Sequence, residues 1–224
     1  MNEVIKQRLH QIGTRALCNP PTLINSYELA EKCILENIHG DFVECGVFNG
    51  SQSAAMALAN QTYKQKRITH LFDSFQGIPM AGPNDDETIT SCIGVPPEGQ
   101  EGALISSGID IRSRQQVIKC MREWRIDINF LKFYEGWFQY TMPKFHSVFK
   151  EKGIAVLRLD GDLYESTKVC LEYLHQYVIK GGFVIIDDYA LMGCRKACDE
   201  FLLFNKVDII SIEGGGGPVY YEKQ

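Results

Sequence analysis

The sequence predicts a doubly wound, mostly parallel α/β sheet in one main domain. Short apolar runs at residues 42–47, 68–73, 130–134, 154–159 and 183–186 alternate with segments of helical periodicity. Strands that alternate with helices in this way are typical of βαβ units and a parallel sheet. The chain has 224 residues, 45% of them hydrophobic, which is enough for one sizeable core.

The N-terminal segment is helical in pattern. We expect helices over residues 3–17 and 26–38, with Ser26 as the N-cap of the second and Gly40 near its end, and a turn at residues 19–21 (NPP). Residues 1–40 would then form an N-terminal helical extension or lid, and residues 41–224 the main domain. The apolar face of the first helix fits either a homo-oligomer contact or a cover over the site; its members are Val4, Ile5, Leu9 and Ile12.

A long irregular segment interrupts the first half of the domain. After the strand at 42–47 we expect a helix over 52–60 and a strand over 68–73. Residues 78–110 are then rich in Gly, Pro, Ser, Asp and Glu without sustained periodicity. Roughly 30 residues without an element is too long for an ordinary connection in a compact domain. We interpret it as a substrate loop or lid, the alternative being a solvated insertion without a function.

The second half alternates more regularly. Helices are expected over 113–124, 142–149, 166–178 and 194–204, around the strands at 130–134, 154–159 and 183–186. Two C-terminal strands, 207–212 and 219–221, are separated by the short Gly-rich loop 213–217. A loop this short favours an antiparallel hairpin, because a parallel connection needs a crossover.

Composition limits the classes of function. The net charge of −5 and pI near 5.6 provide no general basic field, so nucleic acid is not an expected partner. Eight cysteines without a CxxC pair indicate reduced thiols and a cytoplasmic protein. No apolar run reaches 18 residues, so we expect no membrane association.

Two of the predicted strands end in pairs of acidic residues. Asp160 and Asp162 follow the strand at 154–159, and Asp187 and Asp188 follow the strand at 183–186. Ligands of parallel sheets bind at the carboxyl ends of the strands, where these four carboxylates would converge. Without a counter-charge they would repel one another, so a protonated member or a cation is needed, and a hard divalent ion is the simplest answer.

Geometry limits this prediction. Neighbouring residues of a strand face opposite ways, so Asp187 and Asp188 can share one ion only if the chain bends directly after Ile186. One of the two would otherwise cap the following helix. Asp162 has a similar alternative, because an acid at the start of the next helix complements the helix dipole.

The first predicted strand ends in a turn rich in small residues. Residues 44–51 (ECGVFNGS) place Gly46 and Gly50 where a backbone could approach a ligand closely. The spacing is GxxxG and differs from both GxGxxG and the P-loop, and small residues are also common at such turns for packing reasons. Asp73, at the end of the second strand, is placed to bind a ribose diol or, alternatively, to cap the backbone of Phe75 or Gln76.

Five segments together resemble one family. They are residues 42–51 (FVECGVFNGS), 72–79 (FDSFQGIP), 136–143 (GWFQYTMP), 157–167 (LRLDGDLYEST) and 181–189 (GGFVIIDDY). In this order they are similar to the macrocin O-methyltransferase (TylF/MycF-type) family of S-adenosylmethionine-dependent enzymes. The resemblance covers about residues 40–205. It implies a Rossmann-like class I methyltransferase fold, with a seven-stranded sheet that has one antiparallel edge strand.

The resemblance also implies roles for individual residues. Asp160, Asp187 and Asp188 would bind Mg²⁺ (or Mn²⁺), and Asp162 would be the general base. The residues implied to bind S-adenosylmethionine are Glu44, Gly46, Asn49, Gly50, Ser51, Asp73, Ser74, Phe75, Gly136 and Trp137. Asn49 departs from the family, because many relatives have a basic residue there. The implied acceptor is a small hydroxylated natural product, with a sugar or a phenol or catechol hydroxyl.

Other functions remain open on the residues alone. A nicotinamide-dependent oxidoreductase shares a Gly-rich first turn and an acid after the second strand, although neither GxGxxG nor a Tyr/Lys or His proton relay is clear. A noncatalytic small-molecule-binding relative would have to tolerate an unused acidic cluster. A metallohydrolase would leave the first turn unexplained and lacks a histidine cluster.

Overall fold

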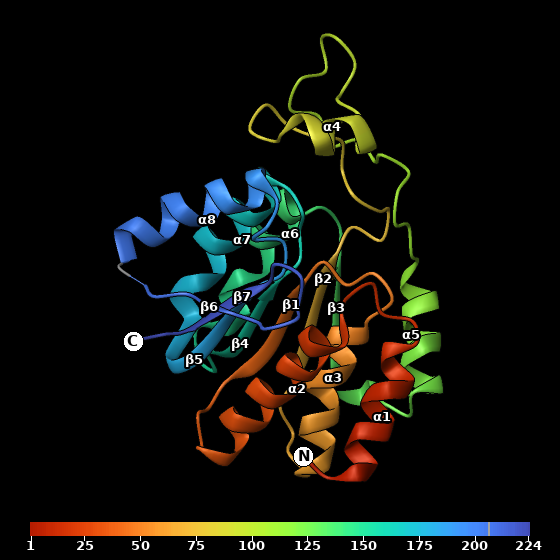
Figure 1. Cartoon of the computed structure of the whole chain (residues 1–224), viewed down its shortest axis with the longest axis vertical. Helices are drawn as coiled ribbons and strands as arrows, with labels where there is room; N and C mark the ends of the chain where they lie inside the picture. Colours follow the sequence, from red (N-terminus) through yellow and green to blue (C-terminus); the bar gives the residue numbers. More distant parts are fainter. Residues whose placement is uncertain (206) are drawn as a thin grey trace.

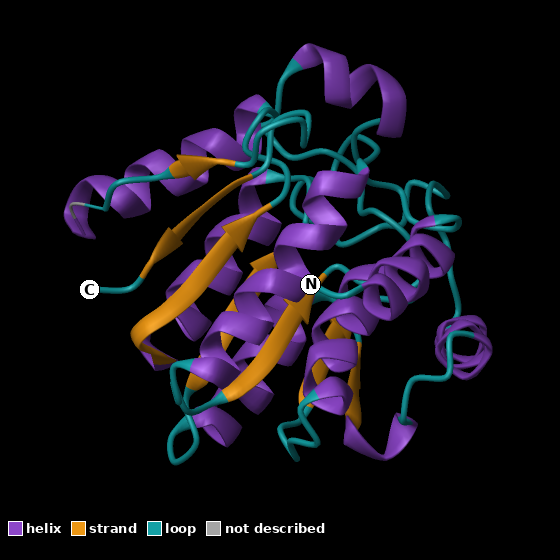
Figure 2. Ribbon diagram, turned by 60° about the horizontal axis from the view of Figure 1, so that its bottom comes forward, coloured by secondary structure: helices purple, strands orange, loops and turns teal. Residues whose placement is uncertain are grey.

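The molecule is a seven-stranded sheet between two layers of helices (Figures 1 and 2). The computed structural model describes residues 1–205 and 207–224, without the side chains of 204 and 205. The strand order is β3-β2-β1-β4-β5-β7-β6. The strands are β1 (Asp41–Cys45), β2 (Thr69–Asp73), β3 (Leu131–Glu135), β4 (Ile154–Leu159), β5 (Val178–Ile186), β6 (Ile210–Ser211) and β7 (Val219–Glu222).

The predicted mostly parallel sheet is confirmed. β1 to β5 pair in parallel, and β7 pairs antiparallel with both β5 and β6. The expected C-terminal hairpin is therefore present. The antiparallel strand β7 lies one position in from the edge, where Val219 and Tyr221 are buried, and the exposed two-residue strand β6 forms the edge itself.

Helices cover the two faces of the sheet in sequence order. One face carries α1 (Glu3–Gly13), α2 (Pro20–Leu35), α3 (Ser51–Thr62) and α5 (Arg114–Glu123). The other carries α6 (Phe138–Phe145), α7 (Tyr164–Leu174) and α8 (Met192–Asn205) (Figure 1). Within the described part of the chain, no helix combines the length and the apolar character needed to cross a membrane.

Alternation along the strands divides the core between these two faces. In β5, Phe183 and Ile185 pack under α1 to α3, whereas Val184 and Ile186 pack under α6 to α8. Successive strand side chains point to opposite faces, so a strand covered on both sides is apolar throughout. β4 is buried at all six positions, and one of them is Arg158. A fully buried arginine is rare unless it is paired.

The N-terminal helices differ from the prediction. α2 begins at Pro20, with Asn19 as its N-cap, and Ser26 lies buried inside the helix. The assignment of Ser26 as an N-cap and of residues 19–21 as a turn was wrong, because proline is well suited to the first helical positions, where its missing N–H is not needed. Ile5, Leu9 and Ile12 of α1 belong to the core of the chain itself, whereas Val4 is exposed.

Other boundaries shift by several residues. The helix expected at 142–149 begins at Phe138 and continues as a 3₁₀ turn, His146–Phe149. α7 ends at Leu174 and β5 begins at Val178, five residues earlier than the strand predicted from 183. Gly181, in the left-handed region at φ 82°, concealed the first half of this strand, which has a register irregularity against β4. Glycine within a strand often marks such a bulge.

The insertion at 78–110 has structure of its own. It contains the short helix α4 (Glu87–Ile93) and projects beyond the carboxyl edge of the sheet (Figure 1). Its two ends pair through a bridge between Pro79 and Ser106 and through the bond from the Ile78 N–H to the Ile109 carbonyl, at 3.1 Å. A small apolar cluster, which includes Ala81 and Ile93, packs against Leu163 of the main domain.

Candidate active site

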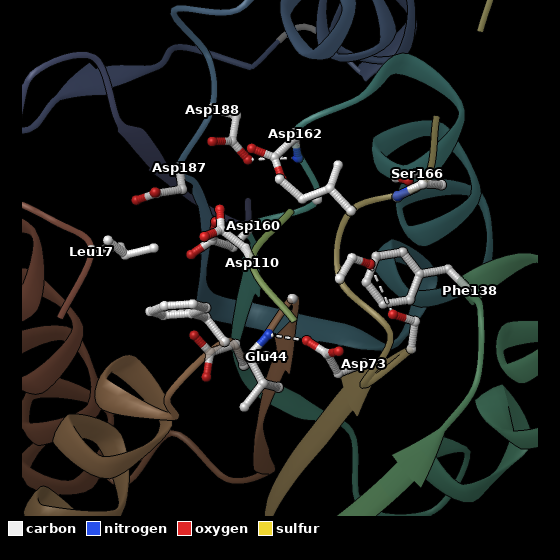
Figure 3. Close-up of a pocket in the computed structure, with 18 of the residues that line it drawn as sticks. Leu17, Glu44, Asp73, Asp110, Phe138, Asp160, Asp162, Ser166, Asp187 and Asp188 are labelled. Carbon is white, nitrogen blue, oxygen red and sulfur yellow. Dashed lines mark hydrogen bonds between the residues drawn. The ribbon is translucent and has the colours of Figure 1, made fainter. Parts of the chain in front are cut away.

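A cavity of about 240 Å³ opens at the carboxyl edge of the sheet. The turns after β1, β2, β3, β4 and β5 contribute to it, as do both ends of the insertion and the connection between α1 and α2. Figure 3 shows Glu44, Asp73, Asp160, Asp162 and Asp188 around this space, at the carboxyl ends of β1, β2, β4 and β5. Parallel strands bring these segments together at one edge.

Three carboxylates form a cluster in which one cation could be held. Each of Asp160, Asp187 and Asp188 offers one oxygen, and these oxygens lie within 4.8 Å of one another. β5 ends at Ile186 and the chain then turns, so the bend that two neighbouring aspartates need is present. Burial and then the neighbouring acids raise the pKa of Asp160 and of Asp188. A hard divalent cation would relieve that repulsion, and an all-oxygen donor set suits Mg²⁺.

Arg158 is the counter-charge that sequence reasoning missed. Its side chain is 0% exposed, and its guanidinium donates to a carboxylate oxygen of Asp187 and, at 3.2 Å, to Asp160 Oδ2. Its Nε lies 3.6 Å from Glu44 Oε1. Burial lowers the pKa of Arg158, but the three acids raise it by more, so the guanidinium stays charged. The signal was available, since a lone arginine interrupts the apolar run of β4.

Asp162 lies next to the cluster in an unusual backbone conformation. Its φ is 58°, a left-handed conformation that aspartate adopts more readily than most residues, and its N–H donates to Asp188 Oδ2 at 2.8 Å. Burial and then the charge of Asp110 raise the pKa of Asp162 to about 7. The first amide of α7 is bound by a different acid, because the Tyr164 N–H donates to Asp85 of the insertion at 2.9 Å.

The turn after β1 brings two segments into unusually close contact. A Cβ added at Gly46, which has φ 90°, would lie 1.6 Å from the carbonyl oxygen of Asp160, so only glycine fits there. Glu44 points inward and accepts hydrogen bonds from the N–H of Ser53, at 2.9 Å, and from its hydroxyl. Burial raises the pKa of Glu44 to about 7 despite the nearby Arg158.

Asp73 makes the backbone contact with Phe75 that was expected as an alternative to ribose binding, and a second contact, with Val47, that was not expected. Its two oxygens accept from the N–H groups of Val47 and Phe75, each at 2.6 Å. Burial nevertheless raises its pKa. Because each carboxylate oxygen has a second lone pair, Asp73 can brace the turn and still accept a ligand hydroxyl from the cavity that it lines.

The cavity gathers most of the predicted site residues. Among the described residues, its lining includes Glu44, Gly46, Ser51, Asp73, Ser74, Trp137, Asp160, Asp162, Asp187 and Asp188. The lining does not include Asn49, Gly50, Phe75 or Gly136. Asn49 instead donates to the Arg15 carbonyl and accepts from Arg112 Nε, both at 2.9 Å, so its side chain holds the N-terminal segment and the end of the insertion.

The cavity also contains residues that the sequence did not identify. Asp110 reaches it from the end of the insertion, and Leu17 and Cys18 from the α1–α2 connection. Gln52 lines it from the first turn of α3, with its Oε1 buried and without a hydrogen-bond partner among the described residues. Asp110, Leu17 and Cys18 lie in irregular segments, so no periodic pattern marked them, and Gln52 lies in a helix whose pattern gave no sign of a ligand.

The strand order, the antiparallel β7 and the small-residue turn after β1 define the fold of a class I methyltransferase. The family model described as macrocin O-methyltransferase (TylF) matches residues 21–223. The chain therefore belongs to the macrocin O-methyltransferase family, as the sequence resemblance indicated.

Relatives of this chain carry names consistent with this family. An 8-demethyl-8-(2,3-dimethoxy-α-L-rhamnosyl)-tetracenomycin-C 4′-O-methyltransferase of Streptomyces olivaceus is 32% identical over 80% of the chain. A demethyldecarbamoylnovobiocin O-methyltransferase of Streptomyces niveus is 32% identical over 90% of it. The matched regions span 64% and 72% of these relatives' own lengths.

Solved structures support the fold. The O-methyltransferase NovP superposes with a TM-score of 0.76 at 29% identity, over 92% of this chain and 81% of that one. The calicheamicin methyltransferase CalS11 superposes with a TM-score of 0.70 at 19% identity, over 98% of this chain and 91% of that one.

Proposed function

We propose that this chain is an S-adenosylmethionine-dependent O-methyltransferase that uses a divalent metal and acts on a hydroxyl of a small natural product. The observation that carries the proposal is the meeting of Asp160, Asp187 and Asp188 in the cavity that the Gly46 turn also lines. The names of the relatives, which include a mycinamicin III 3″-O-methyltransferase of Micromonospora griseorubida, support a natural product as acceptor, and one of these names specifies a rhamnosyl sugar. A phenol or catechol hydroxyl is the other acceptor that we propose.

The metal would be held by Asp160, Asp187 and Asp188. Their donor set is all carboxylate, which suits Mg²⁺ or Mn²⁺ better than a softer ion. Arg158 uses an oxygen of Asp160 and one of Asp187, and each carboxylate keeps its second oxygen. A bound divalent ion would supply Lewis acidity that lowers the pKa of the acceptor hydroxyl.

The cofactor would occupy the half of the cavity formed by β1 and β2. Gly46 allows a close approach to the backbone, Asp73 faces the cavity as an acceptor for the ribose hydroxyls, and the α3 N-terminus at Ser51 offers amides to the methionine carboxylate. Trp137 and Ser74 would border the same molecule.

Asp162 is the residue proposed to accept the proton. S-adenosylmethionine, when bound, would supply the methyl group from its sulfonium to the acceptor oxygen and would leave as S-adenosylhomocysteine. The hydroxyl proton passes to the Asp162 carboxylate. A pKa of about 7 keeps enough of this carboxylate ionised near neutral pH and makes it basic enough to take the proton.

Calorimetric titration tests the cofactor first. Purified protein is titrated with S-adenosylhomocysteine and, separately, with NAD, each with and without Mg²⁺. Micromolar affinity for S-adenosylhomocysteine alone is the expected result, because the turn after β1 lacks the dinucleotide spacing. Binding of NAD alone would favour an oxidoreductase, and binding of neither would indicate a relative that has lost cofactor use.

A further inference from the structure

Among the residues that the structure describes, every charged side chain that lines the cavity is acidic. Seven carboxylates line it: Glu44, Asp73, Asp110, Asp160, Asp162, Asp187 and Asp188. Among the described residues, no lysine, arginine or histidine does so. Arg158 lies beneath the acids without any exposed surface, so its charge is already engaged by Asp160 and Asp187. A cleft lined by charges of one sign concentrates the electrostatic field inside it, so this cavity would attract cations and repel anions.

The insertion that borders the opening has the same sign. Between His70 and Arg112 the sequence has no lysine, arginine or histidine. The acids within the insertion are Asp85, Asp86, Glu87, Glu98, Glu101 and Asp110. The first amides of α4 are bound by Asp86, which accepts from Thr88 and Ile89. Proteins usually bind phosphate groups through arginine or lysine side chains or through free amides at a helix N-terminus. The insertion has no arginine or lysine, and Asp86 already binds the first amides of α4.

One acid of the insertion is fixed at the cavity. Asp110 follows directly after the paired ends of the insertion, where the Ser107 N–H donates to the Ile78 carbonyl at 2.9 Å. Gly77 makes this close pairing possible, because a Cβ there would lie 2.1 Å from the Ile109 carbonyl oxygen. Asp110 lines the cavity together with Asp160 and Asp162 (Figure 3).

We infer that the acceptor of this chain is a hydroxylated molecule that is neutral or bears a protonated amine near the reacting hydroxyl, and that Asp110 selects for it. The inference rests on the proposed function, whose acceptor class it narrows. It excludes nucleoside diphosphate sugars, coenzyme A thioesters and phosphate esters. Among the described residues, the lining provides seven carboxylates and no basic side chain that could pair with an anionic acceptor. An anionic acceptor would therefore meet uncompensated negative charge.

The field in the cavity can be measured without knowledge of the acceptor. The chain has two tryptophans: Trp137 lines the cavity, and Trp124 is buried at the end of α5. In a Trp124→Phe variant loaded with Mg²⁺ and S-adenosylhomocysteine, fluorescence then reports on Trp137 alone. The measured quantity is the quenching constant of iodide, which is an anion, divided by that of acrylamide, which is neutral. We expect this ratio to be about fivefold lower for Trp137 than for free N-acetyltryptophanamide. Equal relative quenching by the two would overturn the inference.

Two further variants test whether Asp110 causes the reduced quenching of Trp137 by iodide. Asp110→Asn removes one charge at the cavity, and Glu98→Gln removes one from the exposed part of the insertion. We expect Asp110→Asn to raise the iodide quenching about twofold, whereas Glu98→Gln leaves it unchanged. The same small change in both variants would mean that only the net charge matters, and would remove Asp110 from the proposal.

A matched ligand pair extends the test to acceptors. Dopamine and 3,4-dihydroxyphenylacetate present the same catechol with opposite charges, and each is titrated into the protein loaded with Mg²⁺ and S-adenosylhomocysteine. We expect dopamine to bind about tenfold or more tightly, and the reverse order would overturn the inference. If neither binds, the quenching ratio alone decides. A protein that binds S-adenosylhomocysteine but admits iodide freely contradicts only this inference, whereas failure to bind S-adenosylhomocysteine contradicts the proposed function.

Discussion

The two halves of the cavity hold the same kind of side chain in different ways. In the half formed by β1 and β2, Glu44 and Asp73 accept hydrogen bonds from Ser53, Val47 and Phe75. In the half formed by β4 and β5, Asp160 and Asp187 share the single guanidinium of Arg158. Asp73 has two backbone donors of its own, whereas Asp160 and Asp187 share one counter-charge with each other and with Glu44, so a cation would add the positive charge that they lack. The comparison shows that donor supply, and not residue type, separates the proposed cofactor half from the proposed metal half.

Loss of Arg158 should have the largest effect. Arg158→Met removes the counter-charge and leaves Asp160, Asp187 and Glu44 together. We expect the free energy of unfolding to fall by about 3–5 kcal/mol, measured by urea denaturation without metal, because breaking a buried ion pair leaves unpaired charge. Millimolar Mg²⁺ should restore part of the loss. A change within about 0.5 kcal/mol, the range of ordinary surface substitutions such as Arg122→Met, would show that the acids do not depend on Arg158.

Asp160→Asn should weaken metal binding in the β4–β5 half of the cavity and leave cofactor binding in the β1–β2 half nearly unchanged. The variant keeps the shape of the side chain but removes one of three clustered carboxylates. We expect the affinity for Mn²⁺, followed by electron paramagnetic resonance, to fall about 100-fold, or about 2.7 kcal/mol, and methyl transfer to be lost. Affinity for S-adenosylhomocysteine should change less than threefold. Unchanged Mn²⁺ binding would remove Asp160 from the metal site.

The pH dependence of stability should distinguish metal-free from metal-loaded protein. Burial and neighbouring acids raise the pKa of Asp160, Asp162 and Asp188, with that of Asp162 at about 7. The folded state then binds more protons than the unfolded state between about pH 4 and 7, so stability falls as pH rises through this window. We expect metal-free protein to be about 2 kcal/mol more stable at pH 5 than at pH 7.5.

Saturating Mg²⁺ should reverse that dependence, because metal binding stabilises the deprotonated carboxylates. Thermal and urea unfolding at the two pH values, with EDTA or with Mg²⁺, provide the measurement. Metal-free protein that gains stability steadily up to pH 7.5 would contradict the repulsion inferred for the β4–β5 half.

Asp73→Asn should have the smallest of these effects. The amide keeps one acceptor oxygen for the turn but loses the second, so Val47 or Phe75 and a ligand hydroxyl compete for it. We expect the dissociation constant of S-adenosylhomocysteine to rise about tenfold, measured by calorimetry, with metal affinity unchanged. Asp73→Ala also tests how Asp73 stabilises the turn after β1, since it leaves the N–H groups of Val47 and Phe75 unpaired. An unaltered dissociation constant in the asparagine variant would limit Asp73 to a structural role.

Several features were predictable from local pattern. β4 has the bounds expected from its apolar run, and the four aspartates after β4 and β5 meet because parallel strands end at one edge. The start of α2 was missed because prolines were interpreted as a turn, and the start of β5 because Gly181 and Gly182 broke the apolar pattern. At α2 the prolines occupy the first helical positions, where the missing N–H is not needed, and at β5 the strand accommodates Gly181 through a register irregularity against β4.

The sequence by itself determined the parallel sheet, the order of its elements and the acids that end β4 and β5, because these follow from short-range periodicity and from strand direction. Only the tertiary structure decided how charge is distributed in the site. It placed Arg158 beneath Asp160 and Asp187, gave Asp73 its backbone donors, and brought Asp110 to the cavity from the end of the insertion. The contacts of Arg158 with Asp187 and of Asp73 with Val47 join segments far apart in the chain. The strength of a charge interaction also depends on distance and burial, which are properties of the folded molecule.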